Sequence, residues 1–135
     1  YLLTRARKRG VKVVIITNGE NSDVPTVSRV NRPLLKYLIK RGVEIYDYSE
    51  RMMHAKTAII DGKIATVGSV NINYRSFFRD HEICAFLRRE SWIKTLQSQF
   101  EEDLSLSKPI TLESLKQSFF GKIVDGLFYL IRSFF

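Results

Sequence analysis

The chain has 135 residues, 44% of them apolar, and its 22 Lys and Arg against 14 Asp and Glu give a formal net charge of +8. This length and apolar content suit one domain with a hydrophobic core, and the charge favours an anionic partner such as a phospholipid surface, a nucleic acid or a small phosphate ester. The single cysteine, Cys84, excludes a disulfide framework or a cysteine-rich zinc cluster, and no run approaches the ~18 apolar residues of a membrane-spanning helix.

The first part of the chain alternates between helical and strand-like patterns. Residues 1–9 are predicted to form a helix, and the β-branched run 11–17 is predicted to form a buried strand. Apolar residues at helical spacing predict a second helix over 26–40, which Pro33 should bend or restart, and a second strand follows over 43–46. Helices and strands in alternation favour a parallel sheet covered by helices.

The middle of the chain carries a hairpin pattern. The extended runs 54–60 and 63–67 are separated by Asp61-Gly62, which is a strong signal for a two-residue turn. Residues 81–87 are predicted to form one more strand. Together with the preceding alternation, this predicts an α/β fold with a mixed, largely parallel β-sheet flanked by helices.

The last part of the chain is predicted to be helical. A helix is expected over 90–104, a linker over 105–109, and a final helix capped by Thr111. We therefore expect a domain over residues 1–105 and an amphipathic helical tail over 106–135. The apolar, aromatic face of this tail suits either a membrane interface or packing against another part of the protein, and helical faces more often do the second.

Two side chains near the start of the hairpin suit an anionic substrate. His54 and Lys56 stand two residues apart in an expected strand, so both should project from the same face. The imidazole can attack or exchange a proton, and the ammonium can hold a phosphate oxygen. These two residues are the first candidates for catalysis, and a solvated strand edge is the alternative.

A second polar group follows the hairpin. Gly68 permits a close backbone approach, and Ser69 and Asn71 provide a hydroxyl and an amide at the same two-residue interval. With His54 and Lys56 they would form one wall of a phosphate cradle, although a plain turn is an equally good interpretation of Ser69 and Asn71. No metal or other cofactor is expected, because the nearby carboxylates are too few and badly spaced for a two-metal site.

These residues form one string with fixed intervals: His54-x-Lys56, four residues, Asp61-Gly62, five residues, Gly68-Ser69-x-Asn71. The complete string resembles the phospholipase D superfamily, which is known by its His-Lys-Asp signature. Over roughly the first 105 residues, the chain resembles the C-terminal half of bacterial cardiolipin synthases. The supporting positions are 9–13, 38–46, 53–57, Arg75-Ser76 and Glu82, with Asp80 standing where the family usually has Asn.

The resemblance implies a role for each polar residue. His54 would attack phosphorus or protonate the leaving alkoxide. Lys56, Ser69 and Asn71 would bind the phosphate oxygens. Glu82 would accept the imidazole Nδ1–H and fix its tautomer, although an ordinary strand carboxylate is the alternative.

Other residues near the motif are expected to be structural. Asp61 should lie at the hairpin tip and Gly68 at a close backbone approach, neither of them in contact with substrate. Arg75 and Arg79 could meet lipid head groups, but a salt bridge with a neighbouring carboxylate is equally consistent with the sequence. His81 has no lysine at the required interval and is expected to be exposed or structural.

The family uses two His-Lys-Asp motifs in one site, and this chain has one. We therefore expect the second motif to come from an absent N-terminal half or from another copy in a homodimer. The start at Tyr1, which reads as the second half of a helix, also suggests a segment of a longer protein.

The resemblance implies a phosphatidyl transferase of the cardiolipin synthase type, with phosphatidylglycerol as donor and acceptor and a covalent phosphohistidine as intermediate. The implied partners are this anionic phospholipid and a membrane surface, and the implied location is the bacterial cytoplasmic membrane. Two alternatives stay open. One is hydrolysis, by a phospholipase D or by a dimeric nuclease acting on nucleic acid, and the other is a non-catalytic phosphate- or lipid-binding module.

Overall fold

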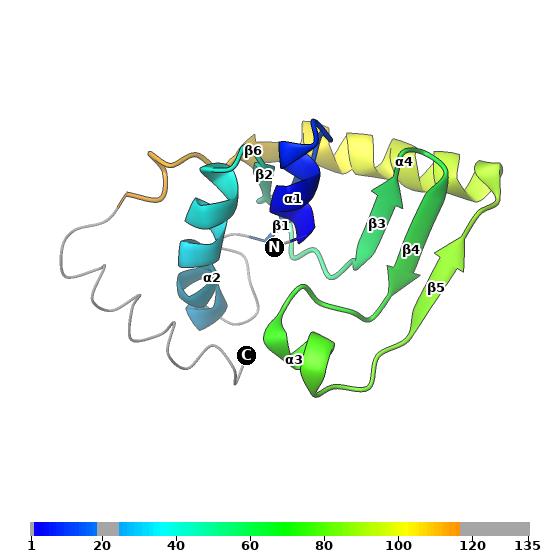
Figure 1. The fold of residues 1–135 in the computed structure, drawn as a ribbon, viewed down its shortest axis with the longest axis horizontal. Coiled ribbons are helices and arrows are strands. Elements are labelled where there is room, and N and C mark those ends of the chain that lie inside the picture. Colours follow the sequence, from blue (N-terminus) through cyan, green and yellow to red (C-terminus); the bar gives the residue numbers. More distant parts are fainter. Residues whose placement is uncertain (1, 19–24, 117–135) are drawn as a thin grey trace.

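The computed structural model describes residues 2–18 and 25–116 (Figure 1). It has the mixture of helices and strands that the sequence predicts, which confirms the α/β class. The elements in chain order are α1 (Leu2–Lys8), β1 (Val14–Thr17), α2 (Pro25–Ile39), β2 (Glu44–Tyr48), β3 (Thr57–Ile60), β4 (Ile64–Gly68), α3 (Tyr74–Phe78), β5 (Cys84–Leu87), α4 (Glu90–Ser105) and β6 (Ser107–Pro109).

The described strands form two sheets of three strands, in the orders β1-β2-β6 and β3-β4-β5. Only β1 and β2 pair in parallel, and the pairs β2–β6, β3–β4 and β4–β5 are antiparallel. The β1-β2-β6 sheet is therefore mixed and the β3-β4-β5 sheet is antiparallel, so the strands are less parallel than the sequence suggests. For β3 and β4 the cause is local, because a two-residue hairpin can join only antiparallel strands.

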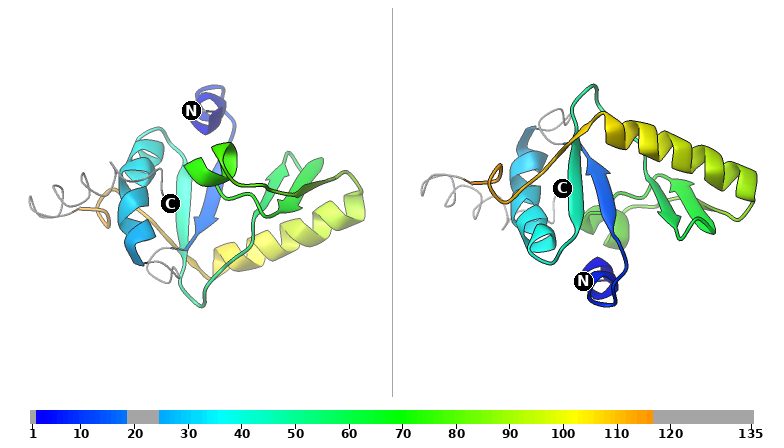
Figure 2. Two further views of the ribbon diagram at one scale, coloured as in Figure 1. Left: turned by 90° about the horizontal axis from the view of Figure 1, so that it is seen from below. Right: turned by 90° about the horizontal axis from the view of Figure 1, so that it is seen from above.

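The helices cover the sheets from different sides. Figure 2 shows α2 beside the β1-β2-β6 sheet, on the side away from the β3-β4-β5 sheet. The long helix α4 contacts strands of both sheets, β2 and β6 on one hand and β3 and β4 on the other. This helix therefore ties together two sheets that share no strand.

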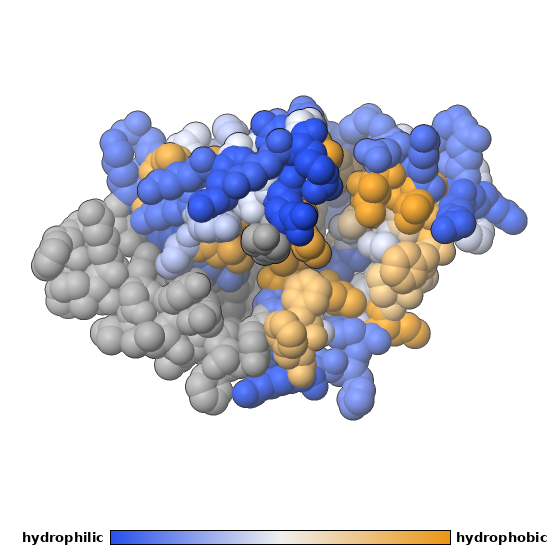
Figure 3. Space-filling view, viewed as in Figure 1, coloured by the Kyte–Doolittle hydropathy of each residue, from blue (hydrophilic) through white to orange (hydrophobic). Residues whose placement is uncertain are grey.

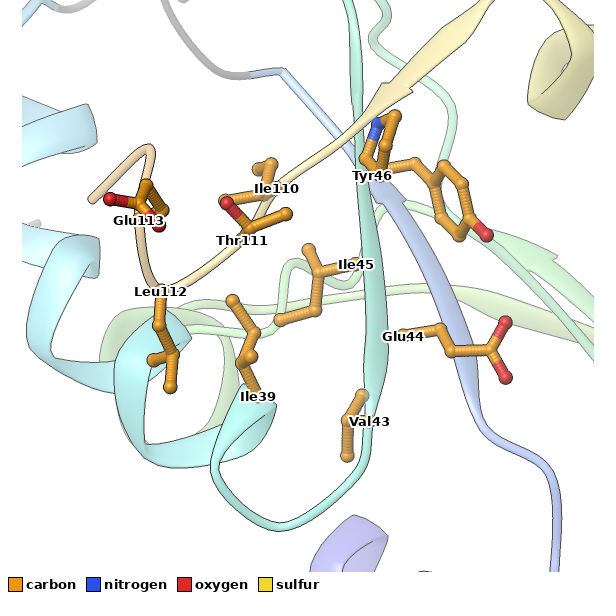
Figure 4. Close-up of a pocket in the computed structure, with 10 residues that line it drawn as sticks. Ile39, Val43, Glu44, Ile45, Tyr46, Ile110, Thr111, Leu112 and Glu113 are labelled. Carbon is orange, nitrogen blue, oxygen red and sulfur yellow. The ribbon is translucent and has the colours of Figure 1, made fainter.

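The main core lies where α2 packs on β2. Leu38, Val43 and Ile45 are buried there and form one cluster. Beside this core, the end of α2, β2 and residues 109–113 surround an open, mostly apolar hollow (Figure 4). Burial of Leu38, Val43 and Ile45 removes their apolar surface from water and so stabilises the packing of α2 on β2. Among the described helices, none is long and apolar enough to cross a membrane.

The turn between β3 and β4 has the geometry that its sequence predicts. Asp61 and Gly62 have φ values of 52° and 62°, both in the left-handed region that a tight hairpin turn of this type requires. The N–H of Lys63 donates to the carbonyl oxygen of Ile60 at 3.0 Å and closes the turn. The predicted hairpin is confirmed.

The expected linker over 105–109 is wrong. Helix α4 continues to Ser105, and residues 107–109 form β6, which pairs with β2. The reason is that the edge of β2 away from β1 would otherwise have unpaired backbone groups, and β6 provides hydrogen-bond partners for them. The N–H of Ile110 also donates to the carbonyl oxygen of Ile45 at 2.8 Å.

Three further expectations for helices can be compared with the structure. Helix α2 runs unbroken through Pro33, so a restart at this proline is wrong. The Oγ1 of Thr111 accepts the N–H of Ser114 at 3.1 Å, which is the predicted capping contact. Residues 112–115 form turns and not a helix, so the expected helix does not begin there, and the rest of the expected tail, 117–135, lies outside the described residues. Helix α3 was not expected, although Asn73 caps it by accepting the N–H of Ser76 at 2.9 Å.

Two glycines of the hairpin region should respond differently to substitution. A Cβ at Gly62 would meet only the end of a flexible side chain, so Gly62→Ala should cost about 1 kcal/mol for the left-handed backbone alone. A Cβ at Gly68 would lie 2.8 Å from the Cα of Cys84, and β4 and β5 would have to separate. Gly68→Ala should therefore cost about 3 kcal/mol or more. Urea denaturation of both variants checks this, and equal losses would contradict the close approach.

Candidate active site

The β3-β4-β5 sheet brings three parts of the motif string to one end. The N–H of Gly68 donates to the carbonyl oxygen of Lys56 at 3.1 Å, which extends the β3–β4 ladder. The N–H of Ser69 donates to the carbonyl oxygen of Ile83 at 2.9 Å, which extends the β4–β5 ladder in the same way. The backbones of Lys56, Ser69 and Glu82 therefore lie beside one another.

His54 and Lys56 are brought together in a different way from the one expected. Strand β3 begins at Thr57, so the expected strand start at His54 is wrong. The Nζ of Lys56 instead points back and donates to the carbonyl oxygen of His54 at 2.9 Å. His54 is exposed and Lys56 is half-buried. An ammonium group thus lies beside the backbone that carries the imidazole.

Glu82 is bound by Ser69. The hydroxyl of Ser69 donates to Oε2 of Glu82, and the same Oγ accepts the N–H of Ile83 at 3.0 Å. In residues 2–18 and 25–116, no hydrogen bond joins the imidazole of His54 to Glu82, so the expected contact with Nδ1–H is not made there. Ser69 stands across the extended β4–β5 ladder from Ile83, the residue after Glu82, and its hydroxyl reaches the carboxylate from there.

Hydrogen bonds hold the pKa of the Glu82 carboxyl below its usual value. The largest cause is the bond donated by Ser69, and the next is a bond donated by Ser76. The positive charge of Lys56 acts in the same direction, and the loss of water around the carboxyl opposes it. Glu82 is therefore a fixed negative charge at neutral pH.

Ser76 is a site residue whose role the sequence did not reveal. It is buried, and its Oγ accepts the backbone N–H of Asn71 at 3.2 Å. Ser76 also helps to lower the pKa of the Glu82 carboxyl, so this one side chain affects both the carboxylate and the segment that carries Asn71. The available signal is the spacing Asn73-x-x-Ser76, which is typical of a helix start. The side chain of Asn71 is exposed and faces no described partner.

The remaining charged residues of the motif region lie apart from this cluster. Asp61 is exposed at the hairpin tip, and at about 3.3 Å per residue it lies roughly 15 Å along the strand from Lys56. Arg75 pairs with Asp80 at 3.1 Å, so the salt bridge with a neighbouring carboxylate is the one of the two alternatives that the structure shows. His81 is exposed.

The arrangement suits a phosphate ester and not a metal ion. An ammonium and an exposed imidazole come from one segment, an exposed amide comes from a second, and a carboxylate that accepts from Ser69 comes from a third. Across the two described ranges, no group of three or more His, Cys, Asp and Glu side chains could hold a metal ion. Figure 3 shows apolar side chains gathered over α3 and the β3-β4-β5 sheet, and the exposed residues include Ile72, Phe77 and Phe78.

Comparisons with known proteins agree on one family. Residues 2–104 match the family model described as cardiolipin synthase, PLD-like domain. The chain is 37% identical over 104 residues to a cardiolipin synthase of Geobacillus sp. (strain WCH70), covering 77% of this chain and 21% of that protein. It is 33% identical over 130 residues to a cardiolipin synthase of Clostridium perfringens (strain SM101), covering 96% of this chain and 27% of that protein.

The chain thus spans about a quarter of the length of these curated relatives. Among solved structures, the crystal structure of Nuc from Salmonella typhimurium, a phospholipase D family member, superposes with a TM-score of 0.65. The two share 18% sequence identity, and the alignment covers 79% of this chain and 69% of Nuc. At this identity the likeness confirms the fold alone.

The hydroxyl of Ser69 should control the ionisation of Glu82. Because the folded-state pKa is lowered, the contact stabilises the fold above the unfolded-state pKa, and this stabilisation is lost as the pH falls through the folded-state value. In Ser69→Ala the pKa of Glu82 should move up towards its usual value, as measured by ¹³C NMR of the carboxyl group.

Glu90 provides the control for this measurement. Its pKa is lowered by Lys94 on α4, with no contribution from Ser69, and should be the same in both proteins. A Glu82 pKa that does not change in Ser69→Ala would contradict the assignment.

Proposed function

The chain belongs to the family of cardiolipin synthase, PLD-like domains, and from this premise we propose that it supplies one of the two catalytic motifs of a phosphatidyl transferase. The observation that carries the proposal is the position of Lys56. Its ammonium contacts the backbone of His54 at the end of the sheet where Ser69 and Asn71 also lie. This contact supports a role for His54 as nucleophile beside Lys56 as phosphate-binding cation.

In the proposed reaction, a nitrogen of the His54 imidazole attacks the phosphorus of phosphatidylglycerol. The P–O bond to the glycerol head group breaks, and glycerol leaves with a proton from the second histidine of the site. A hydroxyl of another phosphatidylglycerol then attacks the phosphohistidine, giving cardiolipin and returning the proton to that histidine. Two displacements replace one difficult displacement, and the histidine at the centre is regenerated.

The other site residues act on the phosphate and its surroundings. Lys56 and Asn71 bind the non-bridging oxygens, where their charge and dipole oppose the negative charge of the transition state. The hydroxyl of Ser69 donates to Glu82. Ser69 therefore assists phosphate binding either by fixing the shape of its loop or by sharing its hydroxyl between Glu82 and the phosphate. Glu82 balances the charge of Lys56 and holds Ser69 and Ser76. Gly68 and Asp61 are structural.

In the proposal, the second His-x-Lys motif of the site is supplied either by another part of a longer polypeptide or by the same motif in a second copy of the chain. His81 does not serve, because its neighbours include no lysine at the required interval. The site is completed when an imidazole from the partner motif faces His54 and protonates the leaving group.

A membrane surface is the proposed place of action, and the bacterial cytoplasmic membrane is the proposed location. The support comes from the net charge of +8 together with exposed aromatic residues beside the site, Phe77 at 59% and Phe78 at 72% exposure. Basic residues attract anionic head groups, and aromatic side chains suit the interface. An apolar, aromatic surface around α3 does not favour nucleic acid as the partner in the way that it favours a lipid surface.

The test uses the intact protein that carries this chain, with ³²P-phosphatidylglycerol in anionic vesicles. We expect a trapped phosphohistidine and cardiolipin as product. His54→Ala should lower cardiolipin formation at least about 10³-fold, as expected when a group required for the chemistry is removed. His81→Ala is the matched control and should retain activity.

Each other outcome changes the proposal in a defined way. Phosphatidic acid as the only product would make the protein a hydrolase, and degradation of DNA without lipid turnover would make it a nuclease. Binding to vesicles with no phosphohistidine and no turnover would leave a non-catalytic lipid-binding module. Full activity in His54→Ala would contradict the mechanism altogether.

A further inference from the structure

A side-chain contact joins the two sheets immediately before His54. Asn18 follows the last residue of β1, and Met53 precedes His54. The Nδ2–H of Asn18 donates to the carbonyl oxygen of Met53 at 2.6 Å, and the Oδ1 of Asn18 accepts the N–H of Met53 at 2.9 Å. Residues 35 positions apart in the sequence are thus joined by a reciprocal pair of hydrogen bonds.

This contact has the form of a backbone pairing. A carboxamide carries the same donor and acceptor as a peptide group, so Asn18 replaces a neighbouring strand for one residue. The ladder with β4 reaches the end of the segment between β2 and β3 at Lys56, and Met53 lies before it, where Asn18 bonds its backbone. Two bonds to one residue fix the orientation of Met53 as well as its position.

The backbone of His54 is held on both sides. Its preceding peptide group contains the carbonyl of Met53, which accepts from Asn18. Its following peptide group contains the carbonyl of His54 itself, which accepts from Nζ of Lys56 at 2.9 Å. The Cα of His54 therefore lies between two anchored peptide planes, and these planes determine its φ and ψ. Backbone angles restrict the rotamers of the side chain, and so they set the direction of the imidazole.

We propose that Asn18 is a positioning residue for His54, which fixes the imidazole for attack on the phosphodiester without touching the substrate. This inference rests on the proposed function. The expected size of the effect follows from geometry, because a displacement of about 1 Å at a reacting group can lower the rate about 100-fold. An amide is needed here: aspartate could accept from Met53 N–H but would place a second oxygen against the Met53 carbonyl.

The experiment measures phosphohistidine formation by rapid quench in the intact protein, with ³²P-phosphatidylglycerol vesicles. Asn18→Ala and Asn18→Asp should lower the rate constant of phosphohistidine formation about 10- to 100-fold. The burst amplitude, which counts active sites, and the KM for phosphatidylglycerol should stay within about twofold of the unmodified protein. Gln99→Ala is the matched control, because Gln99 is an amide on α4 that donates to Asp103 at 3.1 Å. It should change neither quantity.

A second measurement separates failure of this inference from failure of the proposed function. The ring Hε1–Cε1 signal of His54 in the ¹H–¹³C spectrum should shift or broaden in Asn18→Ala and stay unchanged in Gln99→Ala. An unmodified protein that forms no phosphohistidine overturns the proposed function, while the ring signal still tests Asn18. A reduced amplitude with an unchanged rate constant overturns the inference, since Asn18 would then serve folding alone. An unchanged ring signal in Asn18→Ala also overturns it.

Discussion

The close approach of β4 to β5 at Gly68 is the constraint on which the site depends. With no side chain at this position, the backbone carbonyl of Ile83 comes near enough to bond the N–H of Ser69 at 2.9 Å. That contact sets the Ser69 hydroxyl against Glu82 and leaves Asn71 to follow into the turn before α3. On its other edge the same strand pairs with the backbone of Lys56. One strand thus aligns the cation, the hydroxyl and the carboxylate.

The polar network behind the site is a fixed frame, and the groups in front of it are exposed. Ser69 donates to Glu82, and the buried Ser76 accepts from the backbone N–H of Asn71. The side chains of His54, Ser69 and Asn71 are exposed. Fixed dipoles behind a reacting centre need no reorganisation during the reaction, which is where electrostatic catalysis gains its advantage. In the proposed reaction, the exposure of His54 and Asn71 leaves room for a phosphate and for an opposing imidazole.

The sequence predicted local elements better than the contacts between distant segments. Residue spacing was sufficient to predict the hairpin, because Asp61-Gly62 strongly favours a two-residue turn. It was also sufficient to predict α4, because the helical pattern of apolar residues extends over a long segment. The pairing of β6 with β2 was missed, since three residues carry no periodic signal and the partner is distant in sequence. The same reason hid Asn18 and Ser76. Each is a small polar residue whose importance comes from a partner that only the fold supplies.

The two anchors of His54 also explain why a strand was expected where none exists. The alternation His54-x-Lys56 was interpreted as two side chains on one strand face, but Lys56 bonds the His54 carbonyl, and Asn18 takes the hydrogen bonds that a strand neighbour would have made to Met53. A regular strand would spread its hydrogen bonds evenly and point successive side chains to opposite faces. Anchoring by individual side chains instead allows the backbone at His54 to take the angles that the imidazole requires. The irregular segment before β3 is therefore fixed by two side chains, Asn18 and Lys56, and not by a regular strand pairing.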